Sequence, residues 1–139
     1  MSLMKSRSSK RAPRKNVEAA IQKALIVWVR ETYPEIRVSM SANENNHYHL
    51  DMGIDVGEPD LWLYKMGADN ICHFLRLELK TTIGKLNPNQ EEWNMWFDIE
   101  FGNCANHKRA VAYGFPQARE LINNWFATIN DDNKNKGGV

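Results

Sequence analysis

The sequence predicts an α/β domain in which a mixed β-sheet is flanked by helices. Two short apolar runs, residues 61–65 and 71–79, are separated by the turn-like stretch 66–70 and predict an antiparallel hairpin. A helical segment follows, and after it a further apolar run, residues 109–115. A strand–helix–strand crossover places the later strand parallel to the earlier one, which makes the sheet mixed.

Helices are expected at both ends of this core. Asn16 can cap a helix over residues 17–31, whose apolar stripe gives it one face to bury. Residues 36–41 then form the first strand. The last helix is expected to open at Pro116, and its apolar residues recur at helical spacing: Ala118, Leu121, Ile122, Trp125 and Ile129.

The helix between the hairpin and the parallel strand has clear start and stop signals. Asn87 suits the N-cap, Pro88 the first turn, and Gln90 stands at the capping-box position. The glycine-containing loop 81–86 leads into it, and Gly102-Asn103 ends it.

Composition is typical of one soluble globular domain, since 42% of the 139 residues are hydrophobic and 25% are charged. We expect the domain to span residues 16–130, between a disordered basic arm, residues 1–15, and a disordered tail, residues 131–139. Cys72 and Cys104 provide no disulfide framework. No apolar run has the length of a membrane span or of a signal-peptide core, so we expect a cytoplasmic protein.

The N-terminal arm concentrates positive charge. It carries a charge of +6 without any acid, whereas the remaining residues hold 12 bases and 17 acids, a charge of −5. Its basic residues are Lys5, Arg7, Lys10, Arg11, Arg14 and Lys15. Such an arm can bind nucleic acid because its phosphate contacts release counterions. A disordered, solubilising tail is an equally good interpretation of the same composition.

The predicted hairpin brings two carboxylates together. A turn centred on Ala68 or Asp69 places Asp60 opposite Glu78, give or take one residue, with Cβ atoms roughly 4.5–5.5 Å apart. Strand alternation puts both on the face that also carries Lys80, while the leucines face the core. Two carboxylates at this spacing can share a divalent cation. The alternative for a Glu-x-Lys pair alone is a solvated surface pair.

Three linked boxes carry a family resemblance. They are Gly53 to Leu61 with its Gly57-x-Pro59-Asp60 core, Glu78-Leu79-Lys80, and Gly84-Lys85-Leu86-Asn87-Pro88-x-Gln90. Their order and spacing resemble the VRR-NUC family, a branch of the PD-(D/E)xK nuclease superfamily. The resemblance implies a restriction-endonuclease-like core and covers most of the chain.

The resemblance also implies an active centre. Its catalytic residues would be Asp60, Glu78, Lys80, Gln90 and Glu18. Mg²⁺ or Mn²⁺ would be bound by Asp60, Glu78 and the backbone carbonyl of Leu79, with Glu18 as a possible further ligand. Purely structural interpretations remain for two of them, because Gln90 suits a capping box and Glu18 suits the first turn of a helix.

Several other residues are candidates for nucleic-acid contacts. They are Lys85, Arg76, Asn43, His47, Lys10, Arg11, Arg14 and Lys15. Asn43 and His47 belong to the polar loop 43–49, which we expect to face substrate. His47 and His49 could also begin a zinc site, but no residues at suitable spacing complete a tetrahedral set.

The resulting hypothesis is a metal-dependent endonuclease that hydrolyses DNA. Stand-alone small members of the family are similar to Holliday-junction resolving enzymes, so a homodimer acting on branched DNA in repair, encoded by a bacterium or phage, is expected. The alternatives are a monomer directed to flaps or nicks and a non-catalytic DNA-binding module. No small-molecule cofactor and no membrane partner are expected.

Overall fold

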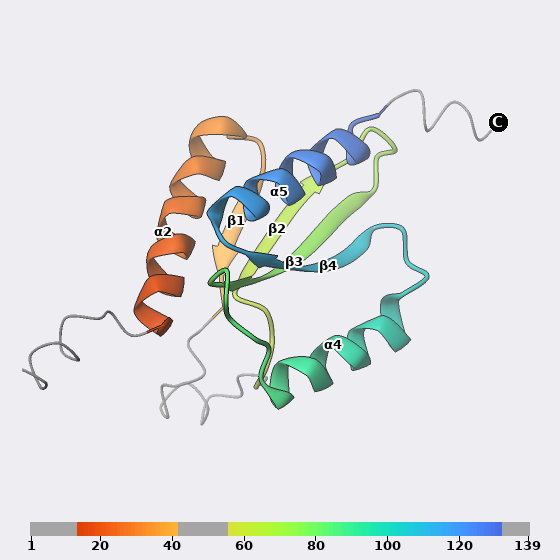
Figure 1. Cartoon of the computed structure of the whole chain (residues 1–139). Coiled ribbons are helices and arrows are strands. Elements are labelled where there is room, and N and C mark those ends of the chain that lie inside the picture. The colour runs from red at the N-terminus through yellow and green to blue at the C-terminus, as the bar shows by residue number, and fades with distance from the viewer. Residues whose placement is uncertain (1–13, 42–55, 132–139) are drawn as a thin grey trace, which may run out of the picture.

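The computed structural model describes residues 14–41 and 56–131. Three helices and four strands are found in this part of the chain (Figure 1). In chain order they are α2 (Arg14–Thr32), β1 (Arg37–Met40), β2 (Leu61–Met66), β3 (Cys72–Lys80), α4 (Pro88–Phe101), β4 (His107–Tyr113) and α5 (Phe115–Ile129).

The strands form one mixed sheet in the order β1-β2-β3-β4. Strand β2 is antiparallel to both β1 and β3, whereas β4 runs parallel to β3 after the crossover through α4. Both the hairpin and the parallel strand were predicted from the sequence and are confirmed. The hairpin register pairs Leu61 with Leu77, so one further step places Asp60 opposite Glu78, as predicted.

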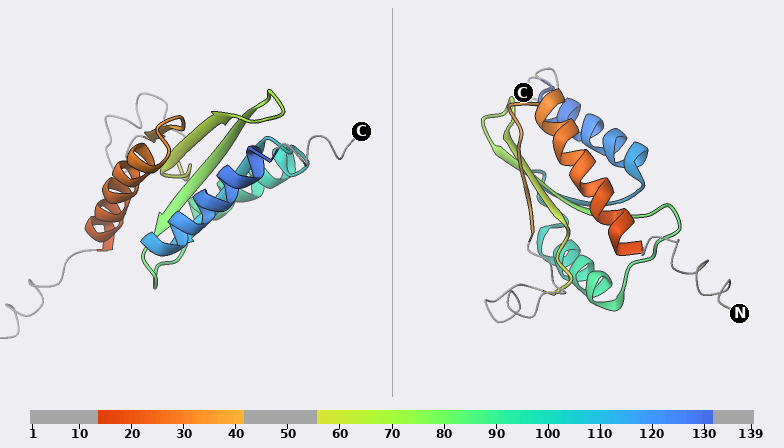
Figure 2. Two further views of the ribbon diagram at one scale, coloured as in Figure 1. Left: turned by 90° about the horizontal axis from the view of Figure 1, so that it is seen from above. Right: turned by 90° about the vertical axis from the view of Figure 1, so that its left-hand side faces the viewer.

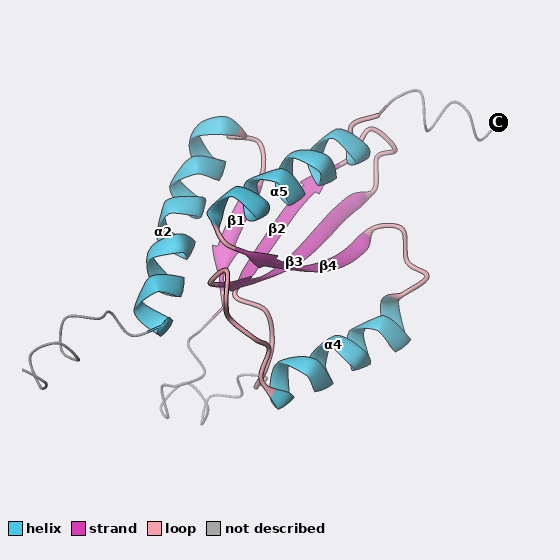
Figure 3. Ribbon diagram, viewed as in Figure 1, coloured by secondary structure: helices cyan, strands magenta, loops and turns pink. Residues whose placement is uncertain are grey.

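The two faces of the sheet are covered by different helices, as the three views together show (Figures 2 and 3). Helices α2 and α5 pack on the leucine face, where Leu61, Leu63 and Leu77 are fully buried. Helix α4 lies on the opposite face, where its Trp93 and Phe97 are buried. Burial of this apolar surface is the main favourable term in holding the three layers together.

Two of the differences between the element boundaries and the predictions have a clear local cause. Helix α2 begins at Arg14 instead of after an Asn16 cap, since Arg14 and Lys15 are good helix formers that extend the helix. Strand β4 ends at Tyr113 and α5 begins at Phe115, because Gly114 has a φ of 96° that breaks the extended chain. The arm up to residue 13 and the tail from residue 132 lie outside the described residues.

None of the helices in the described part of the chain is long and apolar enough to cross a membrane.

Candidate active site

Asp60 is held at the point where the chain enters β2. Gly57, with a φ of 91°, makes the turn before it, and Pro59 is fully buried. The Ser41 amide donates to the Asp60 carbonyl at 2.7 Å, and the Leu79 amide donates to Asp60 Oδ2, also at 2.7 Å. The carboxylate is therefore fixed beside the end of β3, where the sequence predicted it.

Glu78 lies on β3 next to Asp60 and is only 3% exposed. Burial, the negative charge of Asp60 and a side-chain hydrogen bond with Asp60 together raise the pKa of Glu78 to about 10. Glu18 raises the pKa further, whereas Lys80 opposes the shift. Because Glu78 is buried next to the Asp60 carboxylate, a cation would stabilise the charged forms of both groups.

Lys80 and Glu18 come from different elements and approach one another at the same site. The Lys80 ammonium is 4.0 Å from Glu18 Oε2, and the two side chains are 8% and 21% exposed. Glu18 lies in the second turn of α2, so the N-terminal end of that helix reaches the carboxyl end of β3 (Figure 1). The structure thus brings Glu18 to the predicted site, beside the ammonium of Lys80.

Gln90 combines the predicted cap with a contact to the predicted site. Its side-chain Oε1 accepts from the backbone amide of Asn87 at 2.9 Å, and its backbone amide donates to Asn87 Oδ1 at 2.9 Å. These two bonds complete the predicted capping box. Its Nε2 donates to Glu78 Oε2 at 2.9 Å. The capping box therefore fixes the orientation of the Gln90 side-chain amide, whose Nε2 donates to the buried Glu78 carboxyl.

The oxygens at this site suit a hard divalent cation. In the described residues no group of three or more His, Cys, Asp or Glu side chains has an arrangement that could hold a metal alone. Other oxygens would have to complete the coordination of a cation by Asp60 and Glu78. The Leu79 carbonyl is a candidate, because the amide of the same residue donates to Asp60. Mg²⁺ commonly takes one or two carboxylates and keeps several waters, so this set fits it.

Arg76, which the sequence analysis named as a candidate phosphate contact, is buried in the structure. Its side chain is on the predicted face of β3, but it is 4% exposed because the rings of Trp62 and Trp93 cover it, at 3.5 and 5.4 Å from Cζ to the ring centroids. Its Nη2 donates to Glu58 Oε2 at 3.2 Å and to the Pro59 carbonyl at 3.3 Å. Strand alternation could indicate the face but could not reveal that α4 covers it.

Only some of the other residues predicted to contact nucleic acid lie in the described part of the chain. Lys85 is exposed in the loop between β3 and α4. The backbone of Arg14 and Lys15 lies in the first turn of α2. Asn43, His47, His49, Lys10 and Arg11 lie outside the described residues.

The sequence did not reveal how closely the turn before Asp60 approaches α4. A Cβ atom added to Gly57 would overlap the backbone carbonyl of Asn89, the residue before Gln90. Two elements of the site therefore touch through their backbones. The signal was present, since Gly57 was expected to permit a close backbone approach, but its partner could not be inferred without the fold.

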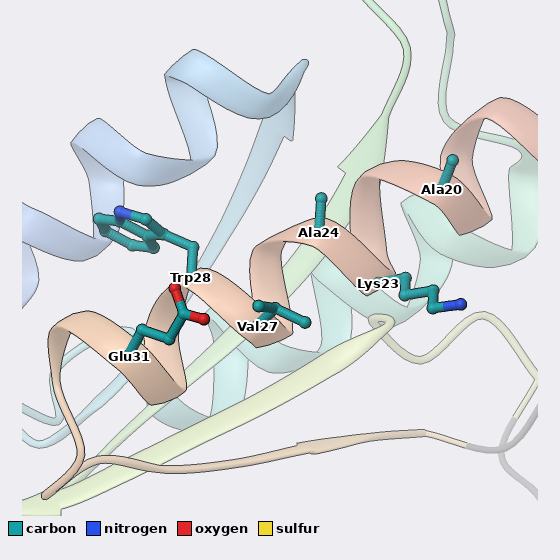
Figure 4. Close-up of a pocket in the computed structure, with 6 residues that line it drawn as sticks. All are labelled: Ala20, Lys23, Ala24, Val27, Trp28 and Glu31. Atoms are coloured by element: carbon teal, nitrogen blue, oxygen red, sulfur yellow. The ribbon is translucent and has the colours of Figure 1, made fainter.

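Two hollows in the described part of the chain lie away from the site. One lies on the outer surface of α2 and is lined by Ala20, Lys23, Ala24, Val27, Trp28 and Glu31 (Figure 4). Another follows the outer edge of β4 beside α5, around Tyr113 and Leu121. Neither contains any of the carboxylates that surround Lys80.

One solved structure, a protein named "VRR_NUC domain protein", has the same fold as this chain. The two agree with a TM-score of 0.58 and 20% sequence identity, over 82% of this chain and 90% of that chain. No family model and no curated protein matches the sequence. The mixed four-stranded sheet, the helices on both of its faces and this likeness agree with the predicted PD-(D/E)xK-like α/β core. This chain therefore shares its fold with that VRR_NUC domain protein.

Proposed function

We propose that this protein is a metal-dependent nuclease that hydrolyses phosphodiester bonds of DNA. The observation that carries the proposal is the meeting of Asp60, Glu78 and Lys80 at the end of β3, with Glu18 and Gln90 against them. The fold supports it, since a solved structure with the same fold is named "VRR_NUC domain protein".

The proposed cation is Mg²⁺ or Mn²⁺, held by Asp60, Glu78 and the carbonyl of Leu79. When bound, such an ion polarises the scissile phosphate and lowers the pKa of an attacking water. Burial of Glu78 and its nearness to Asp60 disfavour two negative charges at this place, and a bound cation would offset them.

The proposed roles of the chain's own groups follow from their positions. Lys80 is buried beside Glu18, so its ammonium can orient the attacking water and offset negative charge that develops on the phosphate. Gln90 holds one oxygen of Glu78 and leaves the other for the cation. Lys85 is exposed on the adjoining loop and can contact a neighbouring phosphate.

Branched DNA is the proposed substrate class, with a homodimer as the acting species. A domain with one catalytic centre makes one cut, and paired cuts on opposing strands require two centres related by symmetry. A monomer acting on flaps or nicks is the alternative, and light scattering combined with gel filtration separates the two. A non-catalytic DNA-binding module is less well supported, because the catalytic groups of the VRR-NUC pattern are all present.

The decisive experiment compares cleavage of labelled linear, flap and four-way DNA with Mg²⁺, Mn²⁺ or EDTA. Asp60→Asn, Glu78→Gln and Lys80→Ala should each reduce the rate by more than the roughly 10–100-fold that follows when a residue orienting a metal ligand is removed. Asp98→Asn is the matched control, since Asp98 pairs with Arg109 and is 56% exposed.

Asp98→Asn should therefore cleave like the wild-type protein. Full activity in folded Asp60→Asn or Glu78→Gln would remove the assignment of the site. Cleavage in EDTA would remove the role of the metal.

A further inference from the structure

Arg76 is a buried cation on the face of the sheet that carries the site, and its contacts extend in two directions. On one side its Nη2 donates to Ser41 Oγ at 3.3 Å, to Glu58 Oε2 at 3.2 Å and to the Pro59 carbonyl at 3.3 Å. On the other side its guanidinium lies near the ring of Trp93, on α4, at 5.4 Å. The ring of Trp62 covers the guanidinium at 3.5 Å.

These contacts join the elements that bring the other site groups to Glu78. Pro59 directly precedes Asp60, and Trp93 lies one helical turn after Gln90 on the same face of α4. Arg76 itself stands two residues before Glu78, on the same face of the same strand. A planar, always charged guanidinium can hold several acceptors and stack on rings at once, which an ammonium cannot do.

We propose that Arg76 is a positioning residue of the active site, which fixes the Pro59–Asp60 segment and α4 relative to Glu78. The inference rests on the proposed nuclease function for its effect on metal binding and cleavage. Arg76 acts through Asp60 and Gln90, because the rings that bury it separate it from solvent and so from DNA.

Arg109 provides a matched control for this role. It lies opposite Arg76 in the β3–β4 register and also contacts α4, through two hydrogen bonds to Asp98 at 2.6 and 2.8 Å. That contact is near the C-terminal end of α4, away from Gln90 and Asp60. Arg109→Lys therefore loosens one arginine contact with α4 and leaves the site groups untouched.

The experiment compares wild-type protein with Arg76→Lys and Arg109→Lys in three measurements. Mn²⁺ affinity is measured by the paramagnetic resonance of free Mn²⁺, and kcat and KM are measured on DNA at saturating Mn²⁺. The amide proton shift of Leu79, which donates to Asp60 Oδ2 at 2.7 Å, is measured without metal.

For Arg76→Lys we expect Mn²⁺ affinity to fall roughly 10- to 100-fold, as for other residues that orient metal ligands. We also expect kcat to fall, KM for DNA to stay within about two-fold, and the Leu79 amide to lose its downfield shift as its bond to Asp60 weakens. Arg109→Lys should match the wild type in all three. Glu58→Gln, whose side chain is 21% exposed, should reproduce the defect more weakly if Arg76→Lys fails to fold.

Two results would overturn the inference. In one, Arg76→Lys binds Mn²⁺ like the wild type and raises KM for DNA with a smaller salt dependence, which identifies a phosphate contact. In the other, the Leu79 amide shift is unchanged in both Arg76→Lys and Glu58→Gln. If wild-type protein binds no Mn²⁺ and cleaves no DNA, the proposed function fails instead, and the Leu79 shift still decides whether Arg76 positions Asp60.

Discussion

At the scale of single residues, Glu78 is a carboxyl whose surroundings oppose its charge. Its pKa of about 10 results first from burial and then from Asp60, with Glu18 adding to the shift and Lys80 opposing it. Because this folded-state pKa lies above the ordinary value of 4.5, the folded protein binds more protons than the unfolded chain between these two values. The free energy of unfolding therefore falls as pH rises through that window.

Glu78→Gln should consequently stabilise the metal-free protein while abolishing cleavage. The amide has no charge to desolvate, so in EDTA at pH 9 we expect a higher Tm, by roughly 2–8 °C for each kcal/mol gained. Thermal unfolding by circular dichroism at pH 6 and pH 9 measures the effect, which should be larger at pH 9. Such a gain is typical where function requires a strained site.

Glu92→Gln, an exposed change on α4, is the control and should follow the wild-type pH profile. Added Mg²⁺ should raise the Tm of the wild type and leave that of Glu78→Gln unchanged. Parallel pH profiles for wild type and Glu78→Gln would contradict the protonation of Glu78 in the metal-free protein.

Gly57 is the residue where backbone geometry leaves no room for a side chain. Its φ of 91° disfavours any L-residue, and an added Cβ would overlap the Asn89 carbonyl. Gly57→Ala should lower the free energy of unfolding by about 1–3 kcal/mol and weaken Mn²⁺ binding, because it separates the turn from the residue before Gln90. Denaturant unfolding and Mn²⁺ titration measure the two effects.

Asn70 supplies the comparison, since it is the non-glycine residue with a positive φ, 61°, in the described part of the chain. Asn70→Gly at the exposed hairpin tip should change stability by only a few tenths of a kcal/mol and leave Mn²⁺ binding intact. A neutral Gly57→Ala would show that the turn can move away from α4 at no cost.

At the scale of elements, the start of α4 combines a structural cap with a contact to the site. Asn87 and Gln90 share the capping box, but only Gln90 also reaches Glu78. Asn87→Ala and Gln90→Ala should each destabilise the protein by about 0.5–2 kcal/mol. Gln90→Ala should in addition lower kcat by roughly ten-fold or more, because it removes the donor from a buried carboxyl.

Thermal unfolding and cleavage rates of the two variants separate these contributions. Asn87→Ala should retain most activity, since the Asn87 amide still holds Gln90 Oε1. Equal activity losses in the two variants would mean that Gln90 acts only through the stability of the helix.

The elements also show which features local sequence determines. The hairpin register follows from its turn, so the pairing of Asp60 with Glu78 could be predicted. The capping box of α4 could be predicted because it lies within four residues. The burial of Arg76 could not, since Trp93 covers it only after α4 crosses the sheet face, and that crossing depends on packing between distant segments.

At the scale of the whole molecule, the site forms where four elements converge. The second turn of α2, the start of β2, the end of β3 and the start of α4 each contribute a side chain. The basic arm precedes α2, which begins at Arg14, and Glu18 lies about 6 Å further along the helix axis. The arm is therefore attached to the chain close to the site. We therefore expect the arm to contact phosphates of DNA bound at the site.

Removal of residues 1–13 should therefore weaken DNA binding without changing the chemistry. It deletes Lys5, Arg7, Lys10 and Arg11 from a chain whose remainder is acidic. For every phosphate that these residues neutralise, the slope of log affinity against log salt should become shallower by about 0.9, while kcat at saturating DNA stays the same. Fluorescence anisotropy between low and physiological salt measures the slope.

Removal of residues 132–139 is the matched truncation, since it shortens the other end and deletes two lysines and one aspartate. Its salt dependence should stay close to that of the full chain. The two interpretations of the arm then separate cleanly: an unchanged slope after loss of residues 1–13 identifies a solubilising tail, and a reduced slope with unchanged kcat identifies a phosphate-binding arm. A lower kcat with an unchanged slope would instead mean that the arm affects catalysis through α2, the helix that carries Glu18.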